Sequence, residues 1–248
     1  MRTVVITGGN RGIGAGLAKY FYDAGDSVVL ASREDSGIAG DLGERAHFFE
    51  CDVTQIDQIH NLAKGAKKRL GSLDVWINNS GFSEWKTLSE ITEDFWDDMI
   101  SVNLKGVMFG CQAAAEVMSE GASIINISSL AGKRGSSHNS VYCASKFGVN
   151  GVTQALAKEL GSRGIRVNAV CPVYIRTAGL DKALEDSVAP ASGKNIDQYI
   201  EDFALSSSAL QRMPSAHEVA SACFYLSSNA ASAITGQCIN VDCGVLPQ

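Results

Sequence analysis

Short runs of apolar, mostly β-branched residues alternate with longer amphipathic stretches along the whole chain. The apolar runs are 3–7, 27–31, 46–51, 73–77, 122–128, 165–171 and 237–241. The helical patterns lie near 11–24, 55–70, 93–118, 140–160 and 215–228. Nearly continuous apolar strands that alternate with helices are typical of a parallel sheet covered by helices on both faces. We therefore expect an α/β fold with a doubly wound sheet of seven parallel strands.

Length and composition favour one domain that spans residues 1–248, of which 45% are hydrophobic and 19% charged. The formal net charge of −6 argues against nucleic acid or an anionic membrane as the main partner. Apolar runs stay well short of the roughly 20 residues that span a bilayer. Because the N-terminal residues enter a strand at once, without the pattern of a signal peptide, we expect a cytoplasmic protein.

One long segment, 178–214, interrupts the alternation. It contains Pro190, Pro214, Gly193 and a run of serines at 206–208. Long inserts in a compact domain are usually lids or binding loops, so we expect a substrate loop or lid here.

Cysteine and histidine give no metal-binding pattern. The seven cysteines show no C-x-x-C spacing, and the four histidines are scattered. Free thiols in a reducing compartment and no metal site are the expected outcome.

A glycine-rich turn follows the first apolar run. In TGGNRGIGAGLAKYF, residues Gly8, Gly12 and Gly14 are spaced G-x-x-x-G-x-G. Glycines at such positions allow a tight turn, a close approach of the backbone to a phosphate, and packing of the next helix on the strand. The N-terminus of that helix offers free N–H groups to a pyrophosphate. The turn therefore predicts a dinucleotide site in a Rossmann-type fold.

Two arginines favour NADP(H) as that dinucleotide. The second strand ends at Ser32 and Arg33, where an acidic residue would bind the ribose hydroxyls of NAD(H). Arg11 precedes the second glycine of the turn, and a guanidinium suits a 2′-phosphate in charge and geometry. Glu34 and Asp35 follow directly, so NAD(H) remains possible.

Tyr142 and Lys146 lie four residues apart in an expected helix, and residues at this spacing share one face. A free tyrosine has a pKa of about 10, and a nearby cation stabilises its phenolate. Such a pair suits proton transfer at a carbonyl oxygen. By itself, however, it is most often an ordinary feature of a helix surface.

Seven ordered segments of the chain resemble the short-chain dehydrogenase/reductase family. They are TGGNRGIG (7–14), CDVT (51–54), NNSG (78–81), VNLKG (102–106), ISSLAG (127–132), YCASK (142–146) and ITGQCINVDCG (234–244). The resemblance covers the whole chain, and it implies hydride transfer between a nicotinamide and a carbonyl or secondary alcohol. It also implies a homo-oligomer, either a dimer or a tetramer.

The resemblance assigns roles to individual side chains. Tyr142 would be the acid/base, and Lys146 would lower its pKa and bind the nicotinamide ribose. Ser129, thirteen residues before the tyrosine, would bind the substrate oxygen, and Asn103 would hold a water next to Lys146. The implied cofactor contacts are Gly8, Asn10, Arg11, Gly12, Ile13, Gly14, Ser32, Arg33, Asp52, Val53, Asn79, Gly81, Tyr142, Lys146, Pro172, Ile175 and Thr177.

Three positions depart from the family pattern. Ser80 replaces the alanine of N-N-A-G, Val173 replaces the glycine of P-G after the sixth strand, and Cys243 replaces a glycine of V-D-G-G. Valine does not easily take positive φ. Either the backbone at Val173 needs no such conformation, or the loop over the nicotinamide has a different shape.

The substrate is less constrained. Residues expected to face it are Phe82, Trp85, His138, Asn139 and Tyr174, together with the segment 178–214, although ordinary packing explains each of them equally well. A 3-oxoacyl-carrier-protein reductase is an alternative, which the net charge of −6 disfavours because the carrier is acidic. A non-catalytic dinucleotide sensor on the same fold is a further alternative.

Overall fold

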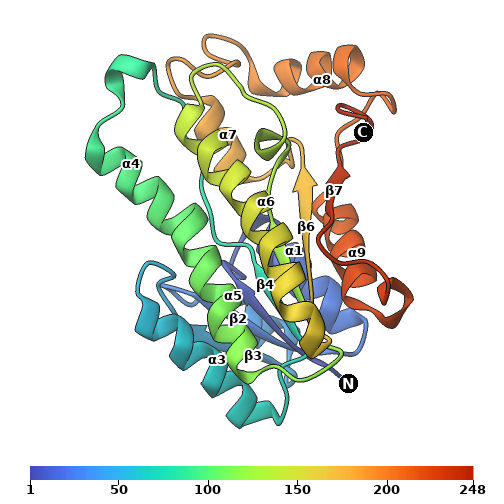
Figure 1. The fold of residues 1–248 in the computed structure, drawn as a ribbon. Coiled ribbons are helices and arrows are strands. Elements are labelled where there is room, and N and C mark those ends of the chain that lie inside the picture. The colour runs from blue at the N-terminus through green and yellow to red at the C-terminus, as the bar shows by residue number, and fades with distance from the viewer. Residues whose placement is uncertain (248) are drawn as a thin grey trace.

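The computed structural model describes residues 1–247, and its centre is one sheet of seven parallel strands (Figure 1). The strands are β1 (Thr3–Thr7), β2 (Ser27–Ser32), β3 (Ala46–Glu50), β4 (Val75–Asn78), β5 (Ser123–Ile127), β6 (Arg166–Pro172) and β7 (Cys238–Val241). Their order in the sheet is β3-β2-β1-β4-β5-β6-β7. This is the doubly wound order with its reversal between β1 and β4, so the predicted Rossmann-type fold is confirmed.

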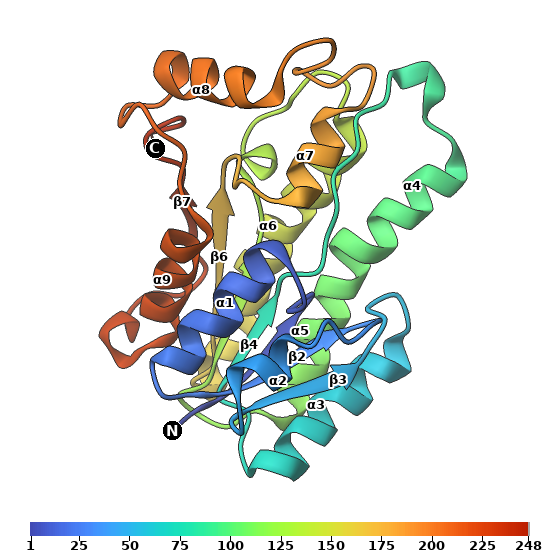
Figure 2. The same ribbon diagram turned by 180° about the vertical axis from the view of Figure 1, so that it is seen from behind.

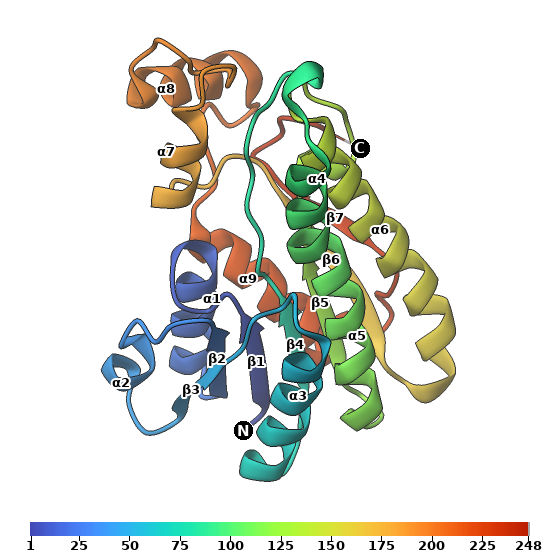
Figure 3. The ribbon, with the colours of Figure 1, turned by 90° about the vertical axis from the view of Figure 1, so that its left-hand side faces the viewer.

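Helices cover both faces of the sheet. They are α1 (Gly12–Asp23), α2 (Ile38–Leu42), α3 (Ile56–Leu70), α4 (Glu93–Ile100), α5 (Gly106–Val117), α6 (Ser140–Leu160), α7 (Ala178–Leu184), α8 (Ile196–Ser207) and α9 (Ala216–Ser227). Helices α3, α5 and α6 lie in front of the sheet in Figure 1, and α1 and α9 lie in front after the half turn to Figure 2. Figure 3 shows the two helix layers on either side of the strands.

The alternation of side chains along each strand explains these two layers. Val5, Trp76 and Ile124 point to the face covered by α3, α5 and α6. Their neighbours Ile6 and Ile77 point to the opposite face, where they pack against α1 and α9. Because both faces are buried, the strands contain almost no exposed position, which is why they appear in the sequence as continuous apolar runs.

The expected helix over 93–118 is divided by a π-helical turn. Residues Ser101–Lys105 form this turn, and the Gly106 N–H donates to the Ser101 carbonyl five residues back. The two flanking α-helices are α4 and α5. The sequence pattern was therefore right about the extent of the helical region but wrong about its continuity.

The segment 178–214 contains two helices, α7 and α8, which the sequence pattern did not predict. Figures 1 and 3 show both beyond the carboxyl ends of the strands. Leu184 on α7 is fully buried in a small cluster with Trp85, separate from the two main cores. Arg176 forms ion pairs with Asp181 on α7 and Asp197 on α8, at 2.7 and 2.6 Å. The sequence also gave no signal for the short helix α2.

All seven cysteines are free thiols, and five of them are buried, as the sequence predicts. Helices of residues 1–247 are too short or too polar to cross a membrane. In the same residues, groups of three or more His, Cys, Asp or Glu side chains that could hold a metal ion do not occur.

Candidate active site

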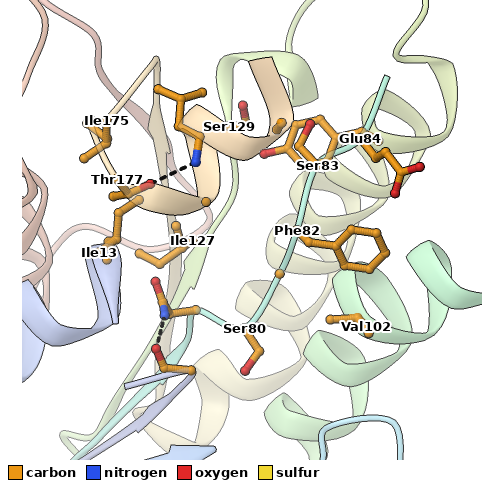
Figure 4. A pocket seen from close by; sticks show the side chains of 18 of the residues that line it. Ile13, Ser80, Phe82, Ser83, Glu84, Val102, Ile127, Ser129, Ile175 and Thr177 are labelled. Atoms are coloured by element: carbon orange, nitrogen blue, oxygen red, sulfur yellow. Dashed lines mark hydrogen bonds between the residues drawn. The ribbon is translucent and has the colours of Figure 1, made fainter. Parts of the chain in front are cut away.

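A cleft of about 1510 Å³ lies at the carboxyl ends of the strands, over the point where the strand order reverses. Ligands of open α/β sheets bind at this position. Figure 4 shows Ile13, Ile175 and Thr177 on one side of the cleft and Phe82, Ser83 and Glu84 on the other. The volume exceeds the roughly 300–1,000 Å³ of an ordinary small-ligand pocket, so the cleft has room for a dinucleotide and a second molecule.

All the cofactor contacts implied by the sequence line this one cleft. They are Gly8, Asn10, Arg11, Gly12, Ile13, Gly14, Ser32, Arg33, Asp52, Val53, Asn79, Gly81, Tyr142, Lys146, Pro172, Ile175 and Thr177. Because they come from both halves of the chain, the fold brings together residues that the sequence separates by more than 160 positions.

The glycine-rich turn at the end of β1 tolerates no side chain at its tightest point. Gly8 and Gly12 have φ of 65° and 53°, in the left-handed region that favours glycine. A Cβ on Gly14 would lie 2.0 Å from the Gly8 carbonyl oxygen. The turn is thus a backbone cradle whose shape depends on the absence of side chains.

Asn79 and Thr7 fasten this turn to β4. The Asn79 side chain donates to the Thr7 and Gly8 carbonyls at 3.0 and 3.1 Å. The Thr7 hydroxyl accepts from the backbone N–H groups of Asn79 and Ser80, at 3.0 and 3.1 Å. Ser80, where the family has alanine, lies tightly against Gly8 and keeps these contacts.

The start of α1 meets the requirements of an anion site. Arg11 is the N-cap residue, its side chain does not cap the helix, and the first turn has no acidic residue. Free N–H groups and a partial positive charge are therefore available at this end of a 12-residue helix. Arg11 and Arg33 are exposed, and neither forms an ion pair with any residue of 1–247. The residues present fit a pyrophosphate and an additional phosphate group.

Two other predicted contacts use part of their polar groups within the protein. The Ser32 hydroxyl donates to the Glu34 carbonyl at 2.7 Å and closes the loop that holds Arg33. One Asp52 oxygen accepts from the N–H and hydroxyl of Thr54, which leaves the other carboxylate oxygen for a ligand.

Tyr142 and Lys146 share the inward face of α6. The Lys146 Nζ lies 5.7 Å from the centroid of the Tyr142 ring and donates to the Ile127 carbonyl at 2.9 Å. Lys146 is only 4% exposed, whereas Tyr142 is partly exposed at the cleft. The end of β5 thus orients the ammonium below the phenol.

Burial dominates the ionisation of both groups. It raises the pKa of Tyr142 to about 12, and hydrogen bonding by the Ser129 hydroxyl acts in the opposite direction. It lowers the pKa of Lys146 to about 8. We expected Lys146 to lower the pKa of Tyr142, but in the protein by itself the burial of the phenol sets the direction of the shift and Lys146 is not among its causes. The Tyr142 phenol is therefore protonated at neutral pH.

The two serines after β5 have different surroundings. The Ser128 hydroxyl donates to the Lys146 carbonyl at 3.3 Å and so ties the strand to α6. The Ser129 hydroxyl accepts from the Ala131 N–H at 3.1 Å and lines the cleft (Figure 4). It also forms the hydrogen bond that opposes the rise in the pKa of Tyr142. Both serines line the cleft, but Ser128 is buried and engaged with the α6 backbone, whereas Ser129 is partly exposed.

Asn103 lies behind the cleft wall and does not line it. It is fully buried in the π-helical turn, and its amide donates to the Phe82 carbonyl and accepts from the Phe82 N–H, at 2.8 and 3.0 Å. A Cβ on Gly81 would lie 3.2 Å from Asn103 Oδ1 and 3.7 Å from Lys146 Nζ. Asn103 therefore fixes the start of the loop after β4 beside Lys146, and its role in holding a water stays a prediction.

A network of buried polar side chains lies below the site, and the sequence patterns did not predict it. The Asn78 amide donates to Asn126 Oδ1 at 2.8 Å, and the Asn126 amide donates to the Thr153 hydroxyl at 2.9 Å. Trp76 Nε1 donates to Asn78 Oδ1 at 2.7 Å. The network joins β4, β5 and α6, and the signal for it was an asparagine within each of two apolar strands.

The remaining departures from the family pattern have different outcomes. Val173 does not have positive φ, and it packs with Leu130, Cys171 and Val245, so its backbone needs no glycine. Cys243 does take the left-handed conformation, with φ of 55°. The part of the cleft lined by Phe82, Trp85 and Asn139, which we expected to face the substrate, is called the substrate end below. Ser83, Glu84 and Ser136 also line it, but they match no sequence motif because they lie on irregular loops.

Comparisons with known proteins find similarity over nearly the whole chain. A family model described as enoyl-(acyl carrier protein) reductase matches residues 8–246. The 3-oxoacyl-[acyl-carrier-protein] reductase FabG of Chlamydia muridarum is 34% identical over 253 residues, which cover 98% of this chain and 97% of the relative.

Two solved structures are also similar. One is a short-chain dehydrogenase/reductase described as glucose/ribitol dehydrogenase, from Brucella melitensis, with a TM-score of 0.90, 30% identity, and coverage of 100% of this chain and 97% of that one. The other is an actinorhodin polyketide ketoreductase with NADPH, with a TM-score of 0.90, 29% identity, and coverage of 98% and 97%.

The fold and the cleft define a parallel α/β protein of the dinucleotide-binding class. With these similarities over nearly its whole length, the chain belongs to the short-chain dehydrogenase/reductase family of oxidoreductases.

Proposed function

We propose that the protein is an NADP(H)-dependent oxidoreductase that interconverts a carbonyl group and a secondary alcohol on a small or medium-sized substrate. The observation that carries this proposal is the convergence of Ser129, Tyr142 and Lys146 at one point of the dinucleotide cleft. A protein that only sensed a dinucleotide would have no need of this set.

The residues around the cleft fit the cofactor. The Gly8–Gly14 turn and the α1 N-terminus would hold the pyrophosphate, and Arg11 and Arg33 would bind a 2′-phosphate. Ile175 and Thr177 would contact the nicotinamide carboxamide. When bound, the nicotinamide supplies or accepts the hydride.

The side chains of the chain itself would manage the proton. Tyr142, protonated at neutral pH, donates a proton to the carbonyl oxygen during reduction and accepts it during oxidation. The Ser129 hydroxyl donates to the same oxygen and stabilises its developing negative charge. Lys146 favours the phenolate that Tyr142 becomes, and Asn103 holds the adjoining loop in place.

The similar proteins divide between acyl and sugar substrates, and 3-oxoacyl-carrier-protein reduction is the second candidate function. Its support is the 34% identity to the FabG reductase. A homo-oligomer is part of the proposal as well. The neighbouring helices α4, α5 and α6 each expose a large apolar side chain, namely Trp96, Met108 and Phe147.

Replacement of the proposed acid/base tests the function. We expect Tyr142→Phe to lower kcat by about 10³-fold or more while NADPH affinity stays within about threefold, because only the hydroxyl is lost. Steady-state kinetics on a ketone panel and NADPH fluorescence titration measure the two quantities. Tyr225→Phe, at an exposed position on α9, is the matched control. Undiminished turnover in Tyr142→Phe would remove Tyr142 from the mechanism.

The cofactor preference has its own test. We expect Arg33→Ala to weaken NADPH binding by about 10- to 100-fold and to change NADH binding by less than about threefold, because only NADPH has the 2′-phosphate. Arg69→Ala, exposed on α3 and outside the cleft, is the control. A wild-type protein that binds NADH as tightly as NADPH, with the same ratio in Arg33→Ala, would contradict the NADP(H) assignment.

A further inference from the structure

Two buried polar atoms at the substrate end of the cleft have no hydrogen-bond partner among residues 1–247. They are Trp85 Nε1 and Asn139 Oδ1. Both side chains line the cleft, and they are only 6% and 5% exposed. An unsatisfied donor or acceptor at such burial is unfavourable, and in a binding cleft it indicates a ligand group that completes it.

The backbone around Asn139 is held rigidly. Its predecessor His138 has φ of 58°, an uncommon conformation for a residue other than glycine. The His138 carbonyl accepts from the Lys86 N–H at 2.8 Å, and the Asn139 carbonyl accepts from the Cys143 N–H at 2.9 Å. Asn139 is the N-cap residue of α6, yet its side chain does not cap the helix. Its amide nitrogen instead donates to the Ser83 hydroxyl at 3.5 Å, which leaves only the Oδ1 atom without a partner, within one helical turn of Tyr142.

Trp85 is held by contacts with the α7 segment. Its backbone N–H donates to Asp186 Oδ2 at 2.9 Å, and its ring packs with Leu184 and Ala183 of α7. The indole N–H is thus positioned by the α7 segment, while Asn139 is positioned by the helix that carries Tyr142. The two orphan atoms approach the substrate end from two separate elements.

The chemistry of the two atoms selects the ligand group. Asn139 Oδ1 is an acceptor and Trp85 Nε1 is a donor. A hydroxyl both donates and accepts, so one or two hydroxyls satisfy both atoms. A hydrocarbon chain satisfies neither, and the carbonyl of an acyl thioester can only accept.

The geometry points to a hydroxylated substrate. We propose that Asn139 and Trp85 recognise a hydroxyl on a carbon next to the reacting carbon, so that the enzyme acts on vicinal diols, polyols or sugars rather than on acyl thioesters. This inference rests on the proposed function, since it assumes turnover at Tyr142. The exposed Ser136 and partly exposed Ser83 on the same wall of the cleft offer further partners for such a substrate.

A matched pair of alcohols tests the inference directly. Oxidation of 1,2-cyclohexanediol and cyclohexanol with NADP⁺ transfers one hydride to the cofactor and releases one proton, and only the diol has the neighbouring hydroxyl. We expect kcat/KM to be about 10- to 100-fold higher for the diol in the wild-type protein. Acetoacetyl thioester reduction with NADPH is the third arm, and we expect it to be slower than reduction of 2-hydroxycyclohexanone by a similar factor.

Two variants assign this preference to the orphan atoms. Asn139→Leu removes the acceptor at nearly constant volume, and Trp85→Phe removes the N–H while an aromatic ring is kept. We expect each to reduce the diol-to-alcohol ratio of kcat/KM by about tenfold. Asn240→Leu is the matched control, because Asn240 Oδ1 also has no partner but the residue does not line the cleft. Thermal melting and NADPH affinity verify that each variant is folded.

The outcomes separate the two proposals. A protein that oxidises cyclohexanol as fast as the diol, or prefers the thioester, overturns the hydroxyl inference and leaves the oxidoreductase proposal standing. An unchanged ratio in both Asn139→Leu and Trp85→Phe overturns it as well. A protein that binds NADPH but turns over no compound of the panel contradicts the proposed function, and this inference with it.

Discussion

The two ends of the cleft are built in different ways. At the proposed cofactor end the contacts for a pyrophosphate come from the backbone of the glycine turn and from the N-terminus of a long helix, at the centre of the sheet, and the side chains of Arg11 and Arg33 lie beside them. At the substrate end they come from side chains on the loop after β4, the approach to α6, and the α7–α8 segment. The first end is part of the main core, whereas the second rests on a small separate cluster.

This difference indicates how the two ends can change. A backbone cradle can be altered only by changing the fold around it, so it is bound to one cofactor class. Side chains on loops can be replaced one at a time with little effect on the core. The same scaffold can therefore carry different substrate specificities, in line with the printed names of its relatives, a 3-oxoacyl-[acyl-carrier-protein] reductase and a glucose/ribitol dehydrogenase.

We expect the largest effect from Gly14→Ala, which adds a single methyl group to the glycine turn. Gly14→Ala would place a Cβ 2.0 Å from the Gly8 oxygen and 2.7 Å from Asn79 Nδ2. We expect NADPH affinity to fall by more than about 100-fold and the protein to lose about 3 kcal/mol of stability or more. Gly40→Ala on α2, where no atom lies within 4 Å, is the control. If Gly14→Ala binds NADPH normally, the cofactor end is not built as we describe.

The second-largest effect is expected in the pH dependence of stability, and it comes from Lys146, which lies where the two ends of the cleft meet. Burial lowers its pKa from 10.5 to about 8, so between these values the unfolded chain binds more protons than the folded protein. The contribution of Lys146 to the free energy of unfolding therefore increases as the pH rises from 8 to 10.5. We expect the free energy of unfolding of the wild type, relative to Lys146→Met, to increase by about 2 to 3 kcal/mol from pH 8 to pH 10.5.

Urea denaturation at several pH values, without cofactor, measures this difference. Lys158→Met, at an exposed position on the same helix, is the matched control. A difference between wild type and Lys146→Met that stays constant over the window would contradict the buried state of the Lys146 ammonium.

The smallest effect on stability is expected from the cluster under the substrate end. Leu184 and Leu17 are both fully buried, the first against Trp85 and the second in a main core. We expect Leu17→Ala to cost about 3 kcal/mol and Leu184→Ala only about 1 to 2 kcal/mol, because the smaller cluster can collapse or open locally.

Kinetic measurements on the same variants test the comparison of the two ends further. We expect Leu184→Ala to raise KM for the substrate severalfold with NADPH affinity unchanged, since Leu184 is at the C-terminal end of α7, where it packs with Trp85 and not with the glycine turn. Equal stability losses in the two variants, or an equal loss of NADPH affinity, would show that the two ends are not independent.

The residues predicted to bind the cofactor line one cleft, and there is a physical reason why the sequence could bring them together. A parallel sheet has a fixed strand order and a glycine turn needs particular residues, so Gly8, Gly12 and Gly14 could be assigned before any coordinates were known. The site residues from Asp52 to Thr177 followed from ordered motifs, and they line one cleft, apart from Asn103 behind its wall.

The sequence failed where side chains act through tertiary contacts. Helices α7 and α8 were not foreseen, because α7 has only seven residues and Pro190 and Gly193, which lie between the helices, are typical of a loop. The pKa of Tyr142 depends on its burial, which no spacing reveals. The orphan atoms of Trp85 and Asn139 become visible only when the loops that carry them are placed against α7 and Tyr142.

The π-helical turn at Ser101–Lys105 changes the direction in which side chains point after the turn, relative to those before it. Each residue of an α-helix advances the side-chain direction by about 100°, so one extra residue in a turn rotates everything beyond it by that angle. Deletion of one residue here would restore a regular helix and keep the composition almost unchanged. It would also turn the Asn103 amide away from Phe82, or turn the apolar face of α5 away from the sheet. The active-site wall therefore depends on the length of the chain at this point as well as on its residues.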